Sequence, residues 1–178
     1  MSHDTDLAWL AGFLDGEGSW VLYYSGGQHK FISTILQTVS TNEDNIRRVK
    51  AIISEIVGRE IRYRLGKGKS LEGRRPTWYL QVTRQEDIAA VCVAILPYLV
   101  GKKPQAELML RYLASSPKAT HTRGSRMNPV SGYTEAHHQM VSEMRHLNRR
   151  YAFGEWLPQQ ETKLTAPEPP GEVIVRTP

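Results

Sequence analysis

The sequence contains a single cysteine, Cys92, and shows no pattern typical of a membrane or secreted protein. One cysteine cannot form an internal disulfide, and Cys92 stands in the apolar run 88–99, where a buried thiol is more common than a nucleophile. No run approaches the roughly 18 apolar residues that span a bilayer, and residues 1–6 lack a signal-peptide pattern. We therefore expect a soluble protein of the cytoplasm, or of an organelle if the gene is organellar, with no membrane and no small-molecule cofactor.

Acidic residues are outnumbered, with 18 Asp and Glu against 23 Lys and Arg and a net charge of +5. Residues 59–76 alone account for this surplus, because they hold seven basic residues against Glu60 and Glu72. The basic residues are Arg59, Arg62, Arg64, Lys67, Lys69, Arg74 and Arg75. A solvated surface is the usual interpretation of such a run. This one overlaps a strand-like pattern, which favours a nucleic-acid partner.

Large side chains are missing from one face of the first predicted helix. Leu7, Leu10 and Leu14 recur at helical spacing, with Asp4 or Thr5 as N-cap, until Gly16 and Gly18 end the helix. Ala8, Gly12 and Gly16 lie four apart, and a face without side chains lets a second helix approach closely. Two copies of the chain could therefore pack against each other.

The end of this helix carries two carboxylates, Asp15 and Glu17. A helix C-terminus has partial negative charge, so acidic residues there are unfavourable unless a cation offsets them. This conflict suggests a metal ion.

The rest of the chain alternates between strand-like and helix-like segments. Strands are predicted at 19–24 and 30–40 and at 60–65 and 77–83, the second pair joined by a long basic loop at 66–76. Helices are predicted at 43–57, 85–99, 103–115 and 135–148, the last with Thr134 as N-cap. His137 and His138 are expected at the surface. Residues 1–157 are expected to form one domain, followed by a proline-rich tail at 158–178.

Alternation divides the strands of the second hairpin between two faces, an apolar one and a polar one. An open antiparallel sheet with helices on its apolar side and arginines on its polar side suits a DNA major groove. Arg62 and Arg64 are expected to reach guanine edges, and Lys67 and Lys69 to contact phosphate. The candidate DNA-binding residues are Tyr23, Ser25, Lys30, Thr34, Thr38, Ser40, Arg62, Arg64, Lys67, Lys69, Arg74, Arg75, Thr77, Tyr79 and Gln81.

Residues 10–18, Leu-Ala-Gly-Phe-Leu-Asp-Gly-Glu-Gly, resemble the signature of the LAGLIDADG homing endonucleases, with five identities. Phe13, Leu14 and Glu17 replace like with like, and only Gly16 departs. A second stretch, residues 97–106, resembles the family's recurrent Pro, aromatic, Leu run followed by Lys and Gln-Ala. The signature occurs once, as in the homodimeric branch of the family.

The resemblance implies an α+β fold, an αββαββα core whose antiparallel sheet forms a DNA-binding saddle with helices on the opposite face. It implies a metal-dependent endonuclease that makes a staggered double-strand break at a long pseudo-palindromic site in double-stranded DNA. Catalytic residues would be Glu17, Lys102 and Asp15, with Glu17 and the Gly16 carbonyl as metal ligands. The dimer interface would include Ala8, Ala11, Gly12 and Asp15.

Mg²⁺ is the expected ion, with Mn²⁺ as a substitute, whereas Ca²⁺ is expected to bind without efficient cleavage. A water-positioning residue is expected among Ser40, Thr41 and Asn42. Two other functions share this scaffold, an intron RNA maturase and a DNA-binding regulator that has lost cleavage. Retention of Glu17 and Lys102 favours the nuclease.

Overall fold

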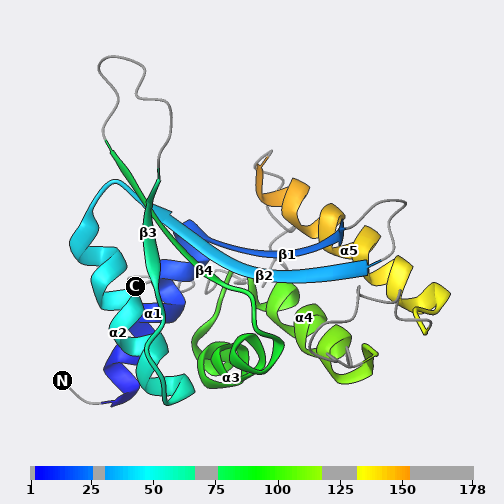
Figure 1. Ribbon diagram of the computed structural model, residues 1–178, viewed down its shortest axis with the longest axis horizontal. Coiled ribbons are helices and arrows are strands. Elements are labelled where there is room, and N and C mark those ends of the chain that lie inside the picture. The colour runs from blue at the N-terminus through cyan, green and yellow to red at the C-terminus, as the bar shows by residue number, and fades with distance from the viewer. Residues whose placement is uncertain (1–2, 26–30, 67–75, 118–131, 153–178) are drawn as a thin grey trace, which may run out of the picture.

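The computed structural model describes residues 3–25, 31–66, 76–117 and 132–152, which form a four-stranded antiparallel sheet and the helices around it (Figure 1). In chain order the elements are α1 (His3–Glu17), β1 (Gly18–Ser25), β2 (Phe31–Ser40), α2 (Glu43–Val57), β3 (Tyr63–Gly66), β4 (Thr77–Val82), α3 (Gln85–Ile95), the 3₁₀ helix η2 (Leu96–Tyr98), α4 (Lys103–Ser115) and α5 (Glu135–Ala152). The predicted α+β class and the αββαββα order are confirmed. The predicted tail at 158–178 and the loop residues Lys67, Lys69, Arg74 and Arg75 lie outside the described residues, as does Lys30.

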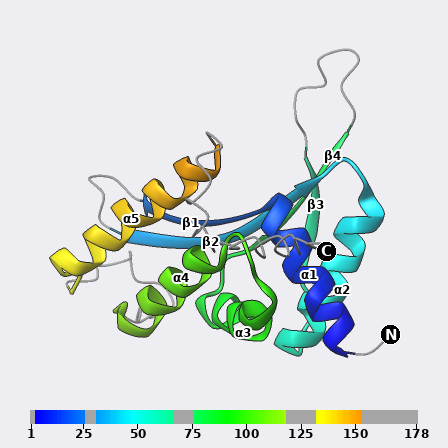
Figure 2. The ribbon, with the colours of Figure 1, turned by 180° about the vertical axis from the view of Figure 1, so that it is seen from behind.

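The strands follow the order β1-β2-β4-β3, so β1 and β3 form the two edges. Helices α1 to α4 lie beneath the sheet in Figure 1, and Figure 2 shows the same layer from behind. Helix α5 packs mainly against β1 and α4. The opposite side of the sheet is left uncovered by these helices, and we call it the open face.

The core is built from the strand residues that point toward the helices and from the apolar sides of those helices. Trp20, Leu22, Leu36 and Leu80 come from the strands, and each is at most 1% exposed. The Trp20 indole donates a hydrogen bond to the Cys92 thiol at 3.3 Å. Burial raises the pKa of that thiol to about 11, so Cys92 is an inert core residue, in line with the sequence-based prediction.

Several predicted boundaries differ from the structure. Helix α1 begins at His3, so Asp4 and Thr5 lie inside it and neither is its N-cap, and α5 continues beyond the predicted residue 148 to Ala152.

Two further differences have a local physical cause. The helix predicted at 85–99 ends at Ile95 and tightens into η2, because Pro97 has no N–H to continue the α-helical hydrogen bonds. The strand predicted at 60–65 begins only at Tyr63. Just before it, the Ile61 N–H donates to the Ser54 hydroxyl of α2 at 3.0 Å, so the chain is held by the helix rather than by the sheet.

His137, predicted at the surface, is buried at the start of α5. Its Nδ1 accepts a hydrogen bond from the Thr134 N–H at 2.9 Å, so its Nε2 carries the proton and donates to the Ser115 carbonyl at 3.1 Å. The ring therefore joins the beginning of α5 to the end of α4. It is a structural residue.

Candidate metal-dependent nuclease site

The site begins where α1 passes directly into β1. Helix α1 ends at Glu17 and β1 starts at Gly18 with no intervening loop. A Cβ on Gly18 would lie 2.5 Å from the Leu14 carbonyl oxygen, closer than atoms can approach, so the junction requires glycine. The Thr38 hydroxyl donates to the Glu17 carbonyl at 3.2 Å and fixes the junction to β2. The direction in which the Glu17 side chain leaves the backbone is thereby set.

Asp15 binds the backbone of the loop that precedes α4. One carboxylate oxygen accepts the N–H of Val100 at 2.8 Å and that of Gly101 at 3.2 Å, and the other accepts the N–H of Lys102 at 2.7 Å. Three hydrogen bonds to one carboxylate make Asp15 an anchor of this loop. Its oxygens are occupied by these donors, so within one chain Asp15 is a structural residue, while its catalytic and interface roles stay predictions.

The Lys102 ammonium lies at the C-terminus of α1. It donates to the carbonyls of Gly18 at 2.6 Å and of Leu14 and Gly16 at 3.2 Å each. Burial lowers the pKa of Lys102, while Asp15 and then Glu17 act in the opposite direction. The positive charge offsets the negative end of the helix, so Lys102 resolves part of the conflict seen in the sequence.

The Glu17 side chain is exposed and has no hydrogen bond or ion pair among the described residues. The neighbouring Gly16 is also exposed, and its carbonyl oxygen, which accepts from Lys102 at 3.2 Å, has a second lone pair. Together they offer a carboxylate and a carbonyl, the hard oxygen donors that Mg²⁺ prefers. The described residues contain no cluster of three His, Cys, Asp or Glu.

The predicted interface residues of α1 divide into exposed and buried ones. Ala8 and Gly12 are exposed, and no atom lies within 4 Å of a Cβ built on Gly12 or Gly16. These three positions form the small-residue stripe of α1. Ala11 is fully buried in the core of its own chain, so its assignment to the interface was wrong. Helical geometry turns Ala11 about 100° away from Gly12, toward Leu7 and Leu14.

The candidate DNA-binding residues also divide between the two faces of the sheet. Tyr23, Ser25, Thr77, Tyr79 and Gln81 lie on the open face, and the backbone register pairs Arg64 with Tyr79. Thr34 and Thr38 are 5% and 1% exposed on the core face, so their assignment to the polar face was wrong.

Two residues that the strand pattern did not reveal take the places of Thr34 and Thr38. Ser33 and Gln37 lie on the open face of β2; the Ser33 hydroxyl contacts that of Ser25 at 2.6 Å, and the Gln37 amide oxygen accepts from Gln81 at 3.0 Å. Register alone could have revealed them, because pairing 18–25 with 38–31 places Gln37 beside Ser19 and Ser33 beside Tyr23.

The three candidates for positioning water lie at the end of β2. The Ser40 hydroxyl accepts the Asn42 N–H at 3.1 Å, and the Asn42 side chain accepts the Asp44 N–H at 2.9 Å as the N-cap of α2. Asn42 is therefore committed to the helix. Ser40 and Thr41 stay candidates.

Comparison with known proteins finds relatives by structure and not by sequence. No family model and no curated protein sequence matches the chain. Among solved structures it is similar to the homing endonuclease I-CvuI, with a TM-score of 0.52 and 16% identity over 81% of this chain and 97% of that one. The homing endonuclease I-TnaI gives a TM-score of 0.52 and 15% identity over 86% of this chain and 97% of that one. The LAGLIDADG homing endonuclease I-GzeII gives a TM-score of 0.51 and 15% identity over 85% of this chain and 50% of that one.

The chain thus has the fold of the LAGLIDADG homing endonucleases, as the two motifs predicted. I-CvuI was crystallised with an uncleaved DNA target in the presence of magnesium and with its own target in the presence of calcium. I-GzeII was crystallised with its DNA target. Among the described residues of the present chain, no helix is long and apolar enough to cross a membrane.

Proposed function

We propose that this protein is a sequence-specific DNA endonuclease that uses Mg²⁺ and acts as a homodimer. Its product would be a staggered double-strand break at a long pseudo-palindromic site. The observation that carries the proposal is the exposed, unpaired Glu17 carboxylate, fixed beside the Lys102 ammonium at the border of an open sheet face. A carboxylate that only ended a helix would need neither a glycine-constrained junction nor a half-buried lysine beside it.

The site residues of one chain have different roles in the proposed reaction. Glu17 and the Gly16 carbonyl would hold the ion, which when bound supplies Lewis-acid stabilisation of charge on the scissile phosphate. Lys102 keeps a positive charge beside the reacting phosphate and holds the carbonyls of the α1 terminus in place. Asp15 fixes the backbone from which Lys102 projects. Positioning and electrostatics of this kind provide most of the rate enhancement in phosphoryl transfer.

A second copy of the chain is needed because one chain presents one Glu17 and a duplex has two strands. The small-residue stripe of α1 offers the contact surface, since Ala8, Gly12 and Gly16 are exposed and open. Close packing of two α1 helices would bring both Glu17 carboxylates near the two-fold axis. The coverage of only half of I-GzeII is consistent with this chain representing one half of a two-unit assembly.

The test compares the wild-type protein with Glu17→Gln on a library of randomised palindromic duplexes in Mg²⁺. Cleavage should fall by several orders of magnitude in the variant, while binding of the selected duplex survives, because the amide keeps the shape and loses the charge that holds the ion. Glu107→Gln, an exposed acid on α4, is the matched control and should cut normally. Mn²⁺ should support cutting, whereas Ca²⁺ should support binding with little cutting.

The result also separates the two other functions of the scaffold. Binding of a duplex by the wild-type protein without cutting in Mg²⁺ would favour a DNA-binding regulator. Preference for a folded intron RNA over every duplex would favour a maturase. A Glu17→Gln protein that still cuts both strands would exclude Glu17 as the metal ligand.

A further inference from the structure

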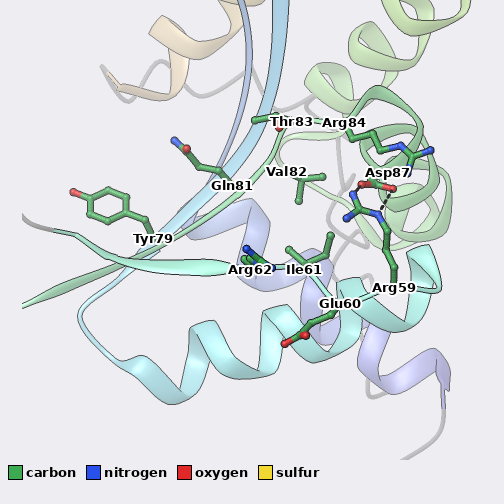
Figure 3. A pocket seen from close by; sticks show the side chains of 10 residues that line it. All are labelled: Arg59, Glu60, Ile61, Arg62, Tyr79, Gln81, Val82, Thr83, Arg84 and Asp87. Atoms are coloured by element: carbon green, nitrogen blue, oxygen red, sulfur yellow. Dashed lines mark hydrogen bonds and ion pairs between the residues drawn. The ribbon is translucent and has the colours of Figure 1, made fainter. Parts of the chain in front are cut away.

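A hollow of about 320 Å³ opens beside β4, at the side of the sheet where β3 begins. Figure 3 shows the side chains that line it, and they come from three places in the chain. The segment 59–62 forms one wall, β4 with Thr83 forms another, and Arg84 and Asp87 close it at the start of α3. Tyr79 and Gln81 belong both to the open face and to the lining of the hollow. The hollow therefore continues the open face around the edge of the sheet.

The hollow exists because β3 is short. On the β2 side, β4 is paired along Gln81 and Val82, but on the β3 side its pairing ends at Leu80. The preceding segment leaves the sheet, since Ile61 is bonded to Ser54 and Lys50 binds Glu60 at 2.6 Å. Ile61 and Val82 are 4% and 2% exposed and form an apolar floor.

Three arginines line this hollow, and they differ in their partners. Arg59 is paired with the buried Asp87 carboxylate, and Arg84 donates to the exposed Glu86 at 2.6 Å. Glu60, the other acid of the lining, is paired with Lys50. Arg62 is exposed and has no hydrogen bond or ion pair among the described residues. Both lining carboxylates are therefore compensated, and the charge of Arg62 remains available.

The other polar groups of the lining can donate hydrogen bonds. The Tyr79 and Thr83 hydroxyls and the Gln81 amide belong to the same lining as Arg62, and all three residues are exposed. Guanidinium groups together with hydroxyl and amide donors are the usual partners of phosphate oxygens in DNA complexes. A phosphodiester carries one negative charge, which matches the one arginine of the described lining that has no hydrogen bond or ion pair to a carboxylate. The Lys50 hydrogen bond and charge lower the pKa of the Glu60 carboxyl, and Arg62 acts on that carboxyl only through its charge.

We propose that this hollow binds a phosphodiester group of the DNA backbone, with Arg62 as its main contact and Arg84 as a second. The inference rests on the proposed function and assigns the edge of the open face a positioning role. It also changes the expected role of Arg62, which the strand pattern assigned to guanine edges. Arg62 precedes β3 and lies outside the strand pairing that would hold it over a groove, whereas Arg64 lies within that pairing.

The experiment measures binding of a random-sequence duplex against salt concentration, because phosphate contacts are independent of sequence. For Arg62→Ala we expect about tenfold weaker binding at roughly 0.1 M salt and a salt slope that is smaller by about 0.9 for each phosphate that is no longer neutralised. Arg62→Lys should keep the slope, and Arg84→Ala should reduce it. Arg111→Ala is the matched control, an exposed arginine on α4 that is paired with Glu143 and does not line the hollow.

The outcomes separate this inference from the function on which it rests. If Arg62→Ala left random-duplex binding unchanged but weakened binding to a selected target, Arg62 would read bases and the phosphate site would be wrong. Unchanged binding to both duplexes would remove the hollow from the DNA interface while leaving the endonuclease proposal intact. Failure of the folded wild-type protein to bind any duplex would overturn both. Thermal unfolding of each variant establishes that the folded protein is being measured.

Discussion

Asp15 and Lys102 hold each other's chain segments in place at the candidate site. The Asp15 carboxylate accepts the backbone N–H of Lys102 at 2.7 Å, and the Lys102 ammonium donates to the carbonyls on either side of Asp15, at Leu14 and Gly16. Each segment thus uses a side chain to bind the backbone of the other: Asp15 of α1 binds the loop before α4, and Lys102 of that loop binds the end of α1. The Glu17 carboxylate, two residues after Asp15, makes none of these hydrogen bonds.

Asp15→Asn should therefore lower the free energy of unfolding by about 1–3 kcal/mol, because an amide can accept on one side only and leaves a backbone N–H without a partner. Glu17→Gln is the matched change two residues away and should leave the free energy of unfolding unchanged, since its carboxylate has no partner to lose. Chemical denaturation of both variants measures the difference. Equal effects would mean that Asp15 does not anchor the loop.

Gly16 and Gly18 of the signature should respond in opposite ways to alanine. Gly18→Ala should destabilise by about 1–3 kcal/mol and impair cleavage, because its Cβ would overlap the Leu14 backbone. Gly16→Ala meets no atom within 4 Å and does not have a positive φ, so it should stabilise α1 by about 0.5–1 kcal/mol. Thermal denaturation distinguishes the two. A stable Gly18→Ala protein would contradict the geometry of the α1–β1 junction.

Gly12→Leu should convert the proposed homodimer to a monomer without unfolding it. Space is open around Gly12 within one chain, so any loss of association must come from a second copy. Overpacking costs roughly 1–3 kcal/mol per site, and this cost applies twice because a two-fold axis brings Gly12 of both chains into the interface. Sedimentation of Gly12→Leu and of Ala51→Leu, an exposed alanine on α2, provides the measurement and its control. A dimer that persists in Gly12→Leu would exclude α1 as the interface.

Local patterns were sufficient to predict most of the elements, because helix spacing and capping are encoded within a few residues. Helix α2 is an example: Ile46, Val49 and Ile53 face the core, and Gly58 ends the helix with a φ of 66°. The signature and the second motif at 97–106 likewise predicted Asp15, Glu17 and Lys102 in one site, and the structure brings these residues together.

The errors arose where a distant residue decides the environment. Thr38 is polar but buried, because its hydroxyl donates to the Glu17 carbonyl 21 residues away. The alternation of residues along a strand cannot reveal an acceptor that lies in another element. Ala11 belongs to the signature but faces inward, since both Leu7 and Leu14 share its side of α1. Arg62 resembled a strand residue, but the bonds that draw the preceding chain to α2 keep it out of β3.

Gln37 tests the corrected open face of β2. Its amide pairs with that of Gln81 at 3.0 Å, which leaves polar atoms of both side chains directed at a groove-bound ligand. Gln37→Ala should relax base preference at a symmetric pair of positions in the selected target, at a cost of about 1–3 kcal/mol. Thr34→Val, the nearby polar residue on the core face, should leave base preference unchanged because its side chain is 5% exposed. Reselecting targets from the randomised library with each variant provides the measurement. If Thr34→Val relaxed the preference and Gln37→Ala did not, DNA would contact the other face of β2, and the helices beneath the sheet would have to move for it to bind.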